Sequence, residues 1–329
     1  MIEQNKTKQY YIDIEHKHGA HNYHPLPVVL KRGKGVHLWD VEGKKYYDFL
    51  SAYSAVNQGH GHPHILDALH SQAEELTLTS RAFHNDQLGP FEKFATDYFG
   101  YDKLLPMNTG AEAVETAIKL CRKWAYEKKG IPENKARIIF VTSNFHGRTM
   151  GAISASTEES SREGFGPYLP GYDIVPYDDI PALEKAIQEP HIAGFMFEPI
   201  QGEAGVVVPH EEYLARAHAL CKKHNVLFIA DEVQTGIART GKLLATCGRC
   251  DCQEFCENKY ETRADILVLG KAISGGVYPV SAVLADDPIM LSIQAGEHGS
   301  TFGGNPLACA VAKAALEVVR DERLDDRAE

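Results

Sequence analysis

Two short apolar runs, each followed by a polar side chain, constrain the fold of this 329-residue chain more than any other feature. Residues 226–230 are all apolar and lead directly into Asp231, and residues 266–269 are apolar and lead into Gly270 and Lys271. Continuous apolar runs of this length, bounded by turn-forming residues, are typical of strands buried on both faces of a sheet. In open α/β sheets the ligand lies outside the carboxyl ends of such strands. The chain therefore predicts a sheet edge at which an acid and a lysine meet.

The same pattern recurs along the chain. Residues 137–141 and 192–197 are further buried strands, and polar, aromatic and charged residues follow each at 143–149 and 198–205. Helices are expected within 64–99, separated by residues 77–83, and at 211–224 and 307–320, and a short strand is expected at 278–285. Strands that alternate with helices imply right-handed parallel crossovers. The expected fold class is α/β, with a mostly parallel, doubly wound sheet flanked by helices.

The amino-terminal part has a different pattern. Short alternating runs at 28–30, 36–40 and 45–49, with a turn at Glu42 and Gly43, predict a small antiparallel meander. A loop of small and polar residues follows at 51–63 and can approach a ligand closely. His60, His62 and His64 admit a metal site, but no acid or thiol lies near them in the sequence, so a loop with helix-capping residues is the preferred interpretation.

Composition excludes several classes of function. A net charge of -11 argues against a surface for nucleic acid or anionic membranes. No apolar run approaches the roughly 20 residues that cross a bilayer. The first residues lack the apolar core of a signal peptide and the Arg-rich character of a transit peptide, so a cytoplasmic location is expected and the mitochondrial matrix remains the alternative. Cys121, Cys221 and Cys309 fall in helical segments and are expected to be buried fillers.

The chemistry of the strand ends favours one cofactor. An ion pair between Asp231 and Lys271 is the simplest alternative, and a plain helix cap is the alternative for Asn108 and Thr109, where a helix begins. Gln234, Phe145 and the glycine-containing helix start at 108–111 instead suit a ring, its phenolic oxygen and its phosphate. These features together predict pyridoxal 5′-phosphate (PLP). The acid keeps the pyridine nitrogen protonated, and the lysine forms a Schiff base and later moves the proton.

Several motifs, in this order along the chain, resemble the class III aminotransferases of the fold-type I PLP enzymes. They lie at 108–113, 145–148, 198–203, 231–236 and 270–272. Within that class, residues 21–27, 53–60 and 164–167 are most similar to the ornithine aminotransferases. The resemblance extends over almost the whole chain from about Gly19.

The resemblance implies a role for each matching residue. Lys271 and Asp231 are the expected catalytic residues. The expected cofactor-binding residues are Gly110, Ala111, Phe145, His146, Asp231, Gln234, Lys271, Ser300 and Thr301, of which Ser300 and Thr301 would reach the phosphate of a neighbouring subunit in a homodimer. His146 occupies a position where the family has a bulky aromatic residue. The expected substrate-binding residues are Tyr23, Tyr53, Arg148 and Glu203.

The implied reaction is a PLP ping-pong transfer of the δ-amino group of L-ornithine to 2-oxoglutarate, which gives L-glutamate 5-semialdehyde and L-glutamate. Such a reaction belongs to arginine and ornithine catabolism and to proline biosynthesis. Two alternatives remain open. One is another ω-aminotransferase of the same class, acting on acetylornithine or 4-aminobutyrate. The other is a catalytically impaired homologue with a metal- or redox-responsive cysteine loop.

Three parts of the chain are expected. Residues 1–53 form an amino-terminal segment with the meander and a substrate-contacting loop, residues 54–322 form the large PLP-binding domain, and residues 323–329 begin a small carboxyl-terminal domain. By resemblance, the rest of that small domain would provide an arginine for the substrate α-carboxylate. Without it the expected result is an open cleft, exposed apolar surface and a protein of low stability or low activity.

A cysteine-rich stretch between Asp231 and Lys271 departs from the family pattern. Cys247, Cys250, Cys252 and Cys256 fall within ten positions, and the first two have a spacing suited to zinc. Disulfide formation on oxidation and a loop of reduced thiols are the alternatives. The sequence leaves the three open.

Overall fold

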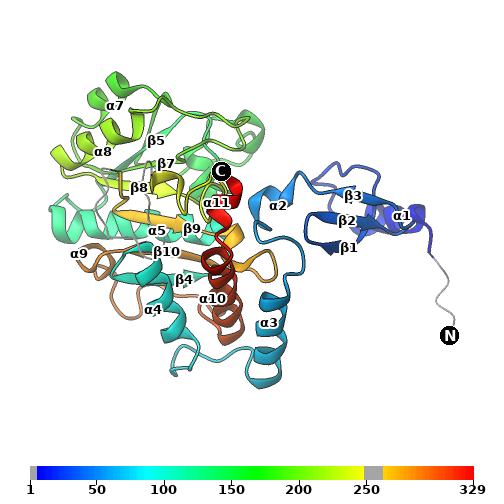
Figure 1. Ribbon diagram of the computed structural model, residues 1–329. Coiled ribbons are helices and arrows are strands. Elements are labelled where there is room, and N and C mark those ends of the chain that lie inside the picture. The colour runs from blue at the N-terminus through cyan, green and yellow to red at the C-terminus, as the bar shows by residue number, and fades with distance from the viewer. Residues whose placement is uncertain (1–5, 248–261) are drawn as a thin grey trace.

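The computed structural model describes residues 6–247 and 262–329. Within them a seven-stranded sheet forms the centre of the main body (Figure 1). Its strands, in spatial order, are β4 (Lys103–Met107), β10 (Ser281–Ala285), β9 (Ile266–Leu269), β8 (Leu227–Asp231), β7 (Ile192–Phe197), β5 (Arg137–Val141) and β6 (Tyr172–Val175).

The sheet is mostly parallel, as the alternation of strands and helices predicted. Strands β9, β8, β7, β5 and β6 run parallel, whereas β10 is antiparallel to both β4 and β9. The reversal follows from the short link between β9 and β10, which consists of the 3₁₀ turn η4 (Lys271–Ser274) and a few further residues. Because this link contains no crossover helix, β10 returns antiparallel.

Alternate residues of the central strands point to opposite faces of the sheet. In β5, Ile138 and Phe140 pack with the long helix α5 (Gly110–Trp124), whereas Ile139 and Val141 pack with α7 (Ile180–Ala186) and α8 (Tyr213–Lys223). At the other end of the sheet, α4 (Leu88–Phe99) and α10 (Pro306–Asp321) cover β9, β10 and β4. Both faces are therefore buried, which explains why these strands are continuously apolar.

The remaining elements are short or lie at the edge of this body. They are α2 (Ser51–Ser54), α3 (Pro63–Glu75), η1 (Ala125–Lys129), α6 (Met150–Ala155), η2 (Glu159–Ser161), η3 (Ala245–Cys247), α9 (Asp287–Met290) and α11 (Leu324–Ala328). Helix α3 packs along α10. Cys121, Cys221 and Cys309 are buried in the core, as expected, and burial raises the pKa of Cys121 to about 12. No helix in the described residues has the length and apolar content to cross a membrane.

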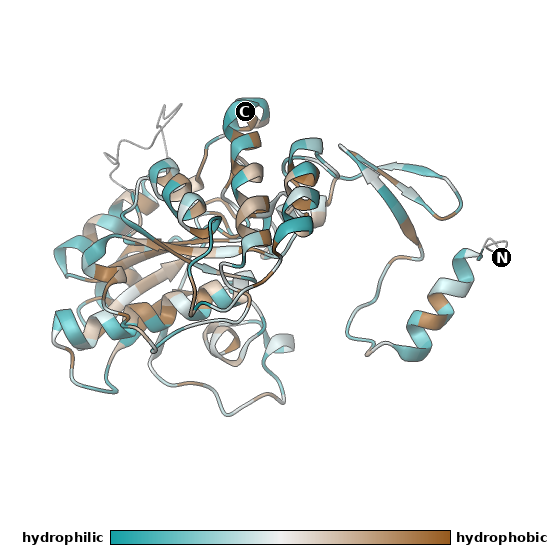
Figure 2. Cartoon of the chain, turned by 90° about the horizontal axis from the view of Figure 1, so that it is seen from below, coloured by the Kyte–Doolittle hydropathy of each residue, from teal (hydrophilic) through white to brown (hydrophobic). Residues whose placement is uncertain are grey.

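The amino-terminal segment forms a separate antiparallel sheet of β1 (Leu30–Lys34), β2 (His37–Asp40) and β3 (Lys45–Tyr47). With α1 (Lys8–His18) it projects from the main body (Figures 1 and 2). The meander was predicted, but its first strand was expected at 28–30 and begins only at Leu30. Helix α1 was not predicted, because it buries no residue and so has no apolar periodicity.

Candidate active site

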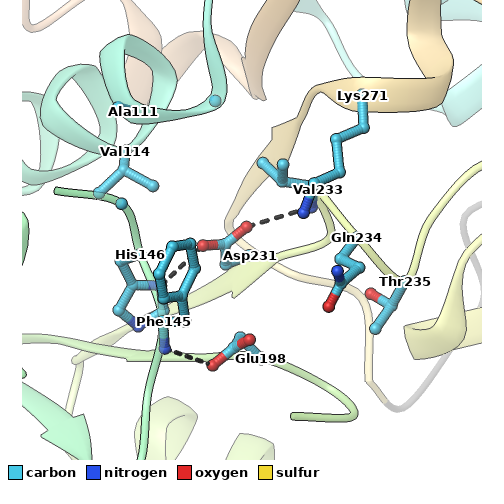
Figure 3. A pocket seen from close by; sticks show the side chains of 12 residues that line it. Ala111, Val114, Phe145, His146, Glu198, Asp231, Val233, Gln234, Thr235 and Lys271 are labelled. Carbon is cyan, nitrogen blue, oxygen red and sulfur yellow. Dashed lines mark hydrogen bonds and ion pairs between the residues drawn. The ribbon is translucent and has the colours of Figure 1, made fainter. Parts of the chain in front are cut away.

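A cavity of about 200 Å³ lies where β5, β7 and β8 end and α5 and η4 begin (Figure 3). It lies at the carboxyl ends of the parallel strands, where the sequence predicted a site. Its lining consists of Gly110, Ala111, Val114, Phe145, His146, Gly147, Glu198, Asp231, Val233, Gln234, Thr235 and Lys271. Asp231, Lys271, Phe145 and the amino terminus of α5 therefore surround one cavity.

Asp231 is buried at the end of β8 and is held from two sides. Its Oδ2 lies 2.6 Å from Nδ1 of the buried His146, and its Oδ1 accepts a hydrogen bond from the backbone N–H of Val233 at 3.1 Å (Figure 3). The alternative of an ion pair between Asp231 and Lys271 is not found in the described residues. Asp231 is instead paired with His146, and its carboxylate keeps a defined direction.

Lys271 is the first residue after Gly270 and has a left-handed backbone with φ of +46°. A non-glycine residue in this region is strained, and such strain is frequent at functional sites. Burial lowers the pKa of Lys271, and the negative charges of Asp231, Glu203 and Glu198 oppose that effect without cancelling it. The amine is therefore more easily deprotonated than an exposed lysine, which suits a nucleophile and a proton carrier.

Glu198 was not among the predicted site residues. It follows β7 directly, lies almost fully buried in the cavity wall, and accepts a hydrogen bond from the backbone N–H of Phe145 at 2.9 Å. Burial raises its pKa to about 7, with a smaller contribution from the charge of Asp231, while nearby His146 opposes the rise. Its position after a buried strand is the same signal that identified Asp231, and could have identified Glu198.

His146 is buried, lines the cavity and contacts Asp231, so it holds this acid in place. Burial disfavours its charged form, but the hydrogen bond and charge of Asp231, together with the charge of Glu198, outweigh burial and raise the pKa of His146. Its Nε2 atom is buried without a partner in the described residues. His146, Asp231 and Glu198 thus lie together in the wall of the cavity.

Helix α5 begins with a capping box that selects Thr109 over Asn108 as the cap. Thr109 Oγ1 accepts from Glu112 N–H at 3.2 Å, and the Glu112 carboxylate accepts from the backbone N–H groups of Thr109 and Asn108. A Cβ on Gly110 would lie 2.9 Å from Val233 Cγ1, so glycine permits the close approach of the helix to the turn at 231–236. The next amides, of Gly110 and Ala111, line the cavity and suit an anion.

Gln234 connects the cavity to its mouth. Its Nε2 donates to Glu203 Oε1 at 2.9 Å and to the backbone oxygen of Tyr53 at 3.4 Å, while its Oε1 is buried without a partner in the described residues. Tyr53 belongs to the left-handed turn at α2, where four consecutive residues have positive φ. The Glu203 carboxylate and the Tyr53 backbone therefore lie beside Gln234, and the role of both residues in substrate binding stays a prediction.

The other predicted residues are less close. Arg148 lies over the Phe145 ring at 5.3 Å and near the Glu158 carboxylate at 3.5 Å, both exposed. Tyr23 is 76% exposed and belongs to the projecting amino-terminal segment (Figure 1). Ser300 and Thr301 line a different, open cavity with residues 78–81 and do not line the cavity at Lys271.

The metal alternatives receive no support from the described residues. His60, His62 and His64 each contact a different carboxylate, of Asp48, Glu322 and Glu317 respectively, and do not converge on one point. No cluster of three metal-ligating side chains occurs in the described ranges. Cys250, Cys252 and Cys256 lie outside the described residues, so the zinc and redox alternatives for the cysteine stretch with Cys247 stay predictions.

The chain belongs to the class III aminotransferases, because it matches the Aminotransferase class-III family over residues 18–329. It is 60% identical over 314 residues to the mitochondrial ornithine aminotransferase of Drosophila ananassae, covering 95% of this chain and 70% of that protein. Among solved structures, the ornithine aminotransferase from Toxoplasma gondii has a TM-score of 0.93 at 50% identity, covering 98% of this chain and 74% of that one. The acetylornithine aminotransferase from Elizabethkingia anophelis has a TM-score of 0.85 at 60% identity, covering 98% and 76%.

Enzymes of this family are PLP-dependent transaminases, and the cavity fits PLP. The buried Gln234 Oε1 has no partner, and no hydrogen bond or ion pair of Lys271 Nζ is found in the described residues. Gln234 and Lys271 both line the cavity, so polar side chains with unused bonding capacity lie at its wall. Asp231 would hold the pyridine nitrogen, Phe145 would lie against the ring, Gly110 and Ala111 would bind the phosphate, and Lys271 would bond to the aldehyde carbon.

Proposed function

We propose that this chain transfers the δ-amino group of L-ornithine to 2-oxoglutarate, giving L-glutamate 5-semialdehyde and L-glutamate. The observation on which the proposal depends is the joining of the cofactor cavity to Glu203 and Tyr53 through Gln234. This connection places the Glu203 carboxylate beside the PLP site. The ornithine aminotransferases among its relatives are consistent with that substrate.

PLP, when bound, supplies an electron-withdrawing ring conjugated to the amino carbon of the substrate. The residues of the chain provide the rest. Asp231, held by His146 and Val233 N–H, is the residue that would keep a proton on the ring nitrogen. Burial lowers the pKa of Lys271, so its Nζ atom loses its proton more easily. The free amine can take a proton from the substrate carbon and later donate it back to the reacting molecule. Phe145, which lines the cavity, would cover one face of the ring and exclude water from it.

The mouth of the cavity favours free ornithine over its acetylated form. The Glu203 carboxylate can attract the charged α-ammonium group of ornithine, whereas an acetamide is neutral and gains no such attraction. We expect Glu203→Gln to lower kcat/KM for ornithine by about tenfold, a change of roughly 1.4 kcal/mol, and to leave acetylornithine less affected. Glu163→Gln, which changes an exposed acid elsewhere, is the matched control.

The proposal is tested by titrating the purified PLP-loaded protein with single amines and recording its visible absorbance. Ornithine should change the spectrum, and adding 2-oxoglutarate should restore it and release one glutamate per amine consumed. Lys271→Ala should lower turnover by about 10²–10⁴-fold or more, since it removes the proton carrier. If acetylornithine changed the spectrum and ornithine did not, the amine donor would be acetylornithine and the proposal would be wrong.

Acetylornithine is the second candidate, and a specific observation favours it. The Elizabethkingia anophelis structure, at 60% identity, is an acetylornithine aminotransferase. The two candidates differ only at the α-nitrogen of the amine donor. The same titration therefore distinguishes them.

We also propose that the chain acts as a homodimer. The projecting amino-terminal segment buries almost no side chain against its own main body, and Ser300 and Thr301 border an open cavity of about 750 Å³ away from Lys271. A second copy would cover the segment and receive these hydroxyl groups at its own cofactor phosphate. Sedimentation of the PLP-loaded protein should give twice the chain mass.

A cytoplasmic location remains part of the proposal. The Drosophila relative's name assigns that protein to the mitochondrion. Fractionation of cells that express the chain with a carboxyl-terminal tag distinguishes the two locations.

A further inference from the structure

Glu232 is a buried acid beside the cofactor cavity for which the reaction has no direct use. It follows Asp231 in the chain, yet only 1% of its surface is exposed. Its neighbours Asp231, Val233, Gln234 and Thr235 all line the cavity, whereas Glu232 does not. Its side chain therefore lies on the other side of the turn. Burial raises the pKa of Glu232, and no cation pairs with it among the described residues.

All the bonding capacity of this carboxylate is used. Oε1 accepts from Thr246 N–H and Thr246 Oγ1, each at 2.8 Å. Oε2 accepts from Ala245 N–H at 3.1 Å and from the Thr235 hydroxyl. Burying a carboxylate without a cation is costly, and several hydrogen bonds are the usual compensation. The acid is thus held in one orientation.

These bonds connect two segments that both lead to the site. Thr235 belongs to the turn at 231–236, which holds Asp231 and Gln234. The backbone oxygen of Thr246 accepts a hydrogen bond from Thr262 Oγ1 at 2.6 Å. Thr262 lies a few residues before β9, and β9 leads to Lys271. The backbone of Glu232 also donates to Val268 of β9 at 3.0 Å. The turn and the lysine strand are therefore fixed to each other through this residue.

We propose that Glu232 is a positioning residue of the cofactor site, which fixes the turn at 231–236 so that Asp231 and Gln234 meet the cofactor ring. The proposal concerns cofactor binding and is independent of which amine the enzyme accepts. A carboxylate is required at this position because each of its oxygens accepts a backbone N–H group. A glutamine in either orientation would direct its own NH₂ group at one of those two donors.

The test compares PLP dissociation constants of the folded protein, measured by equilibrium dialysis, for wild type, Glu232→Gln and the milder Thr246→Val. Glu232→Gln should bind PLP roughly tenfold more weakly, because one buried donor loses its acceptor and the turn moves. Thr246→Val should shift binding in the same direction by about threefold, since only one hydroxyl donor is lost. The pH at which the visible absorbance of bound PLP changes should also shift, because Asp231 is displaced relative to the ring.

Asp265→Asn is the matched control. Asp265 accepts from Phe228 N–H at 2.8 Å at the opposite end of β8, away from the cavity. This variant should lose stability in urea unfolding with PLP affinity and absorbance titration unchanged. If Glu232→Gln and Thr246→Val behave like Asp265→Asn, with lower stability but wild-type PLP affinity and titration, Glu232 is a structural acid and the proposal is wrong. Should Glu232→Gln fail to fold, Thr246→Val decides between the two outcomes.

Discussion

Glu198 differs from an ordinary carboxyl group in its titration. It keeps its proton in the folded protein up to a pKa of about 7, because burial disfavours the charge, whereas an exposed glutamate ionises near 4.5. Between these values the folded state binds more protons than the unfolded state, so stability falls as pH rises from about 4.5 through about 7. The carboxylate thus reduces stability at alkaline pH.

The variant Glu198→Gln removes this titration and can still accept the hydrogen bond from Phe145 N–H. The free energy of unfolding of the variant minus that of wild type should rise by about 2–3 kcal/mol when the pH is raised from about 5 to about 8. Urea unfolding at both values measures the change. Glu163→Gln, an exposed acid, should give the same difference from wild type at both pH values, and parallel curves for Glu198→Gln would contradict the assignment of its raised pKa.

The sequence identified the reacting residues better than the residues that orient them. Asp231 and Lys271 were predicted because each follows an apolar strand, and their side chains are chemically unusual at such positions. Glu232 was not predicted as a site residue, since its role depends on Thr235 and Thr246, and no local pattern states which backbone amides a buried acid will reach. His146 was expected at the cofactor; it lines the cavity and contacts Asp231, and its contact with the cofactor stays a prediction.

Elements were predicted where burial leaves a periodic pattern. Strands β5, β7 and β9 have the bounds that their apolar runs indicated, and α8 and α10 agree to within a few residues. Strand β6 was missed because it is a partly exposed edge strand, with a mixed burial pattern. Exposed elements, such as α1, leave little trace in a sequence because no face of them needs to be apolar.

The amino terminus of α5 permits a prediction at the level of one element. Thr109→Ala removes the cap and should lower the free energy of unfolding by about 1 kcal/mol. It should also weaken PLP binding by about fivefold, because the first turn of the helix no longer holds its amides toward the phosphate. Unfolding of the PLP-free protein and equilibrium dialysis give the two numbers.

Asp179→Ala is the control for this prediction. Asp179 caps α7 by accepting from Ala182 N–H at 2.9 Å, on the far side of the sheet from the phosphate position. Its removal should cost a similar amount of stability and leave PLP affinity unchanged. Equal losses of affinity in the two variants would mean that general stability, and not the helix terminus, controls binding.

At the scale of the whole molecule, the site of one chain is incomplete without a neighbour in the proposed assembly. Lys271, Asp231 and the α5 terminus surround one cavity, whereas Ser300 and Thr301 border another. Ser300 Oγ accepts from Asn108 Nδ2 at 2.9 Å, close to the helix start of its own chain. Ser300 therefore lies beside the helix start of its own chain, and neither Ser300 nor Thr301 lines the cavity that holds the lysine.

Mixed dimers test whether the sites are shared between subunits. One chain has Lys271→Ala, and the other has Ser300→Ala with Thr301→Val; different affinity tags isolate the heterodimer. If the hydroxyl groups serve the partner's site, the lysine-containing chain receives intact hydroxyls from the other chain, and about half of the sites keep wild-type PLP affinity and turnover. If they serve their own chain, both sites are defective and no wild-type sites appear. Each parental homodimer, measured alone, gives the baseline for its own defect, so activity in the heterodimer above both baselines can arise only from a site built by two chains.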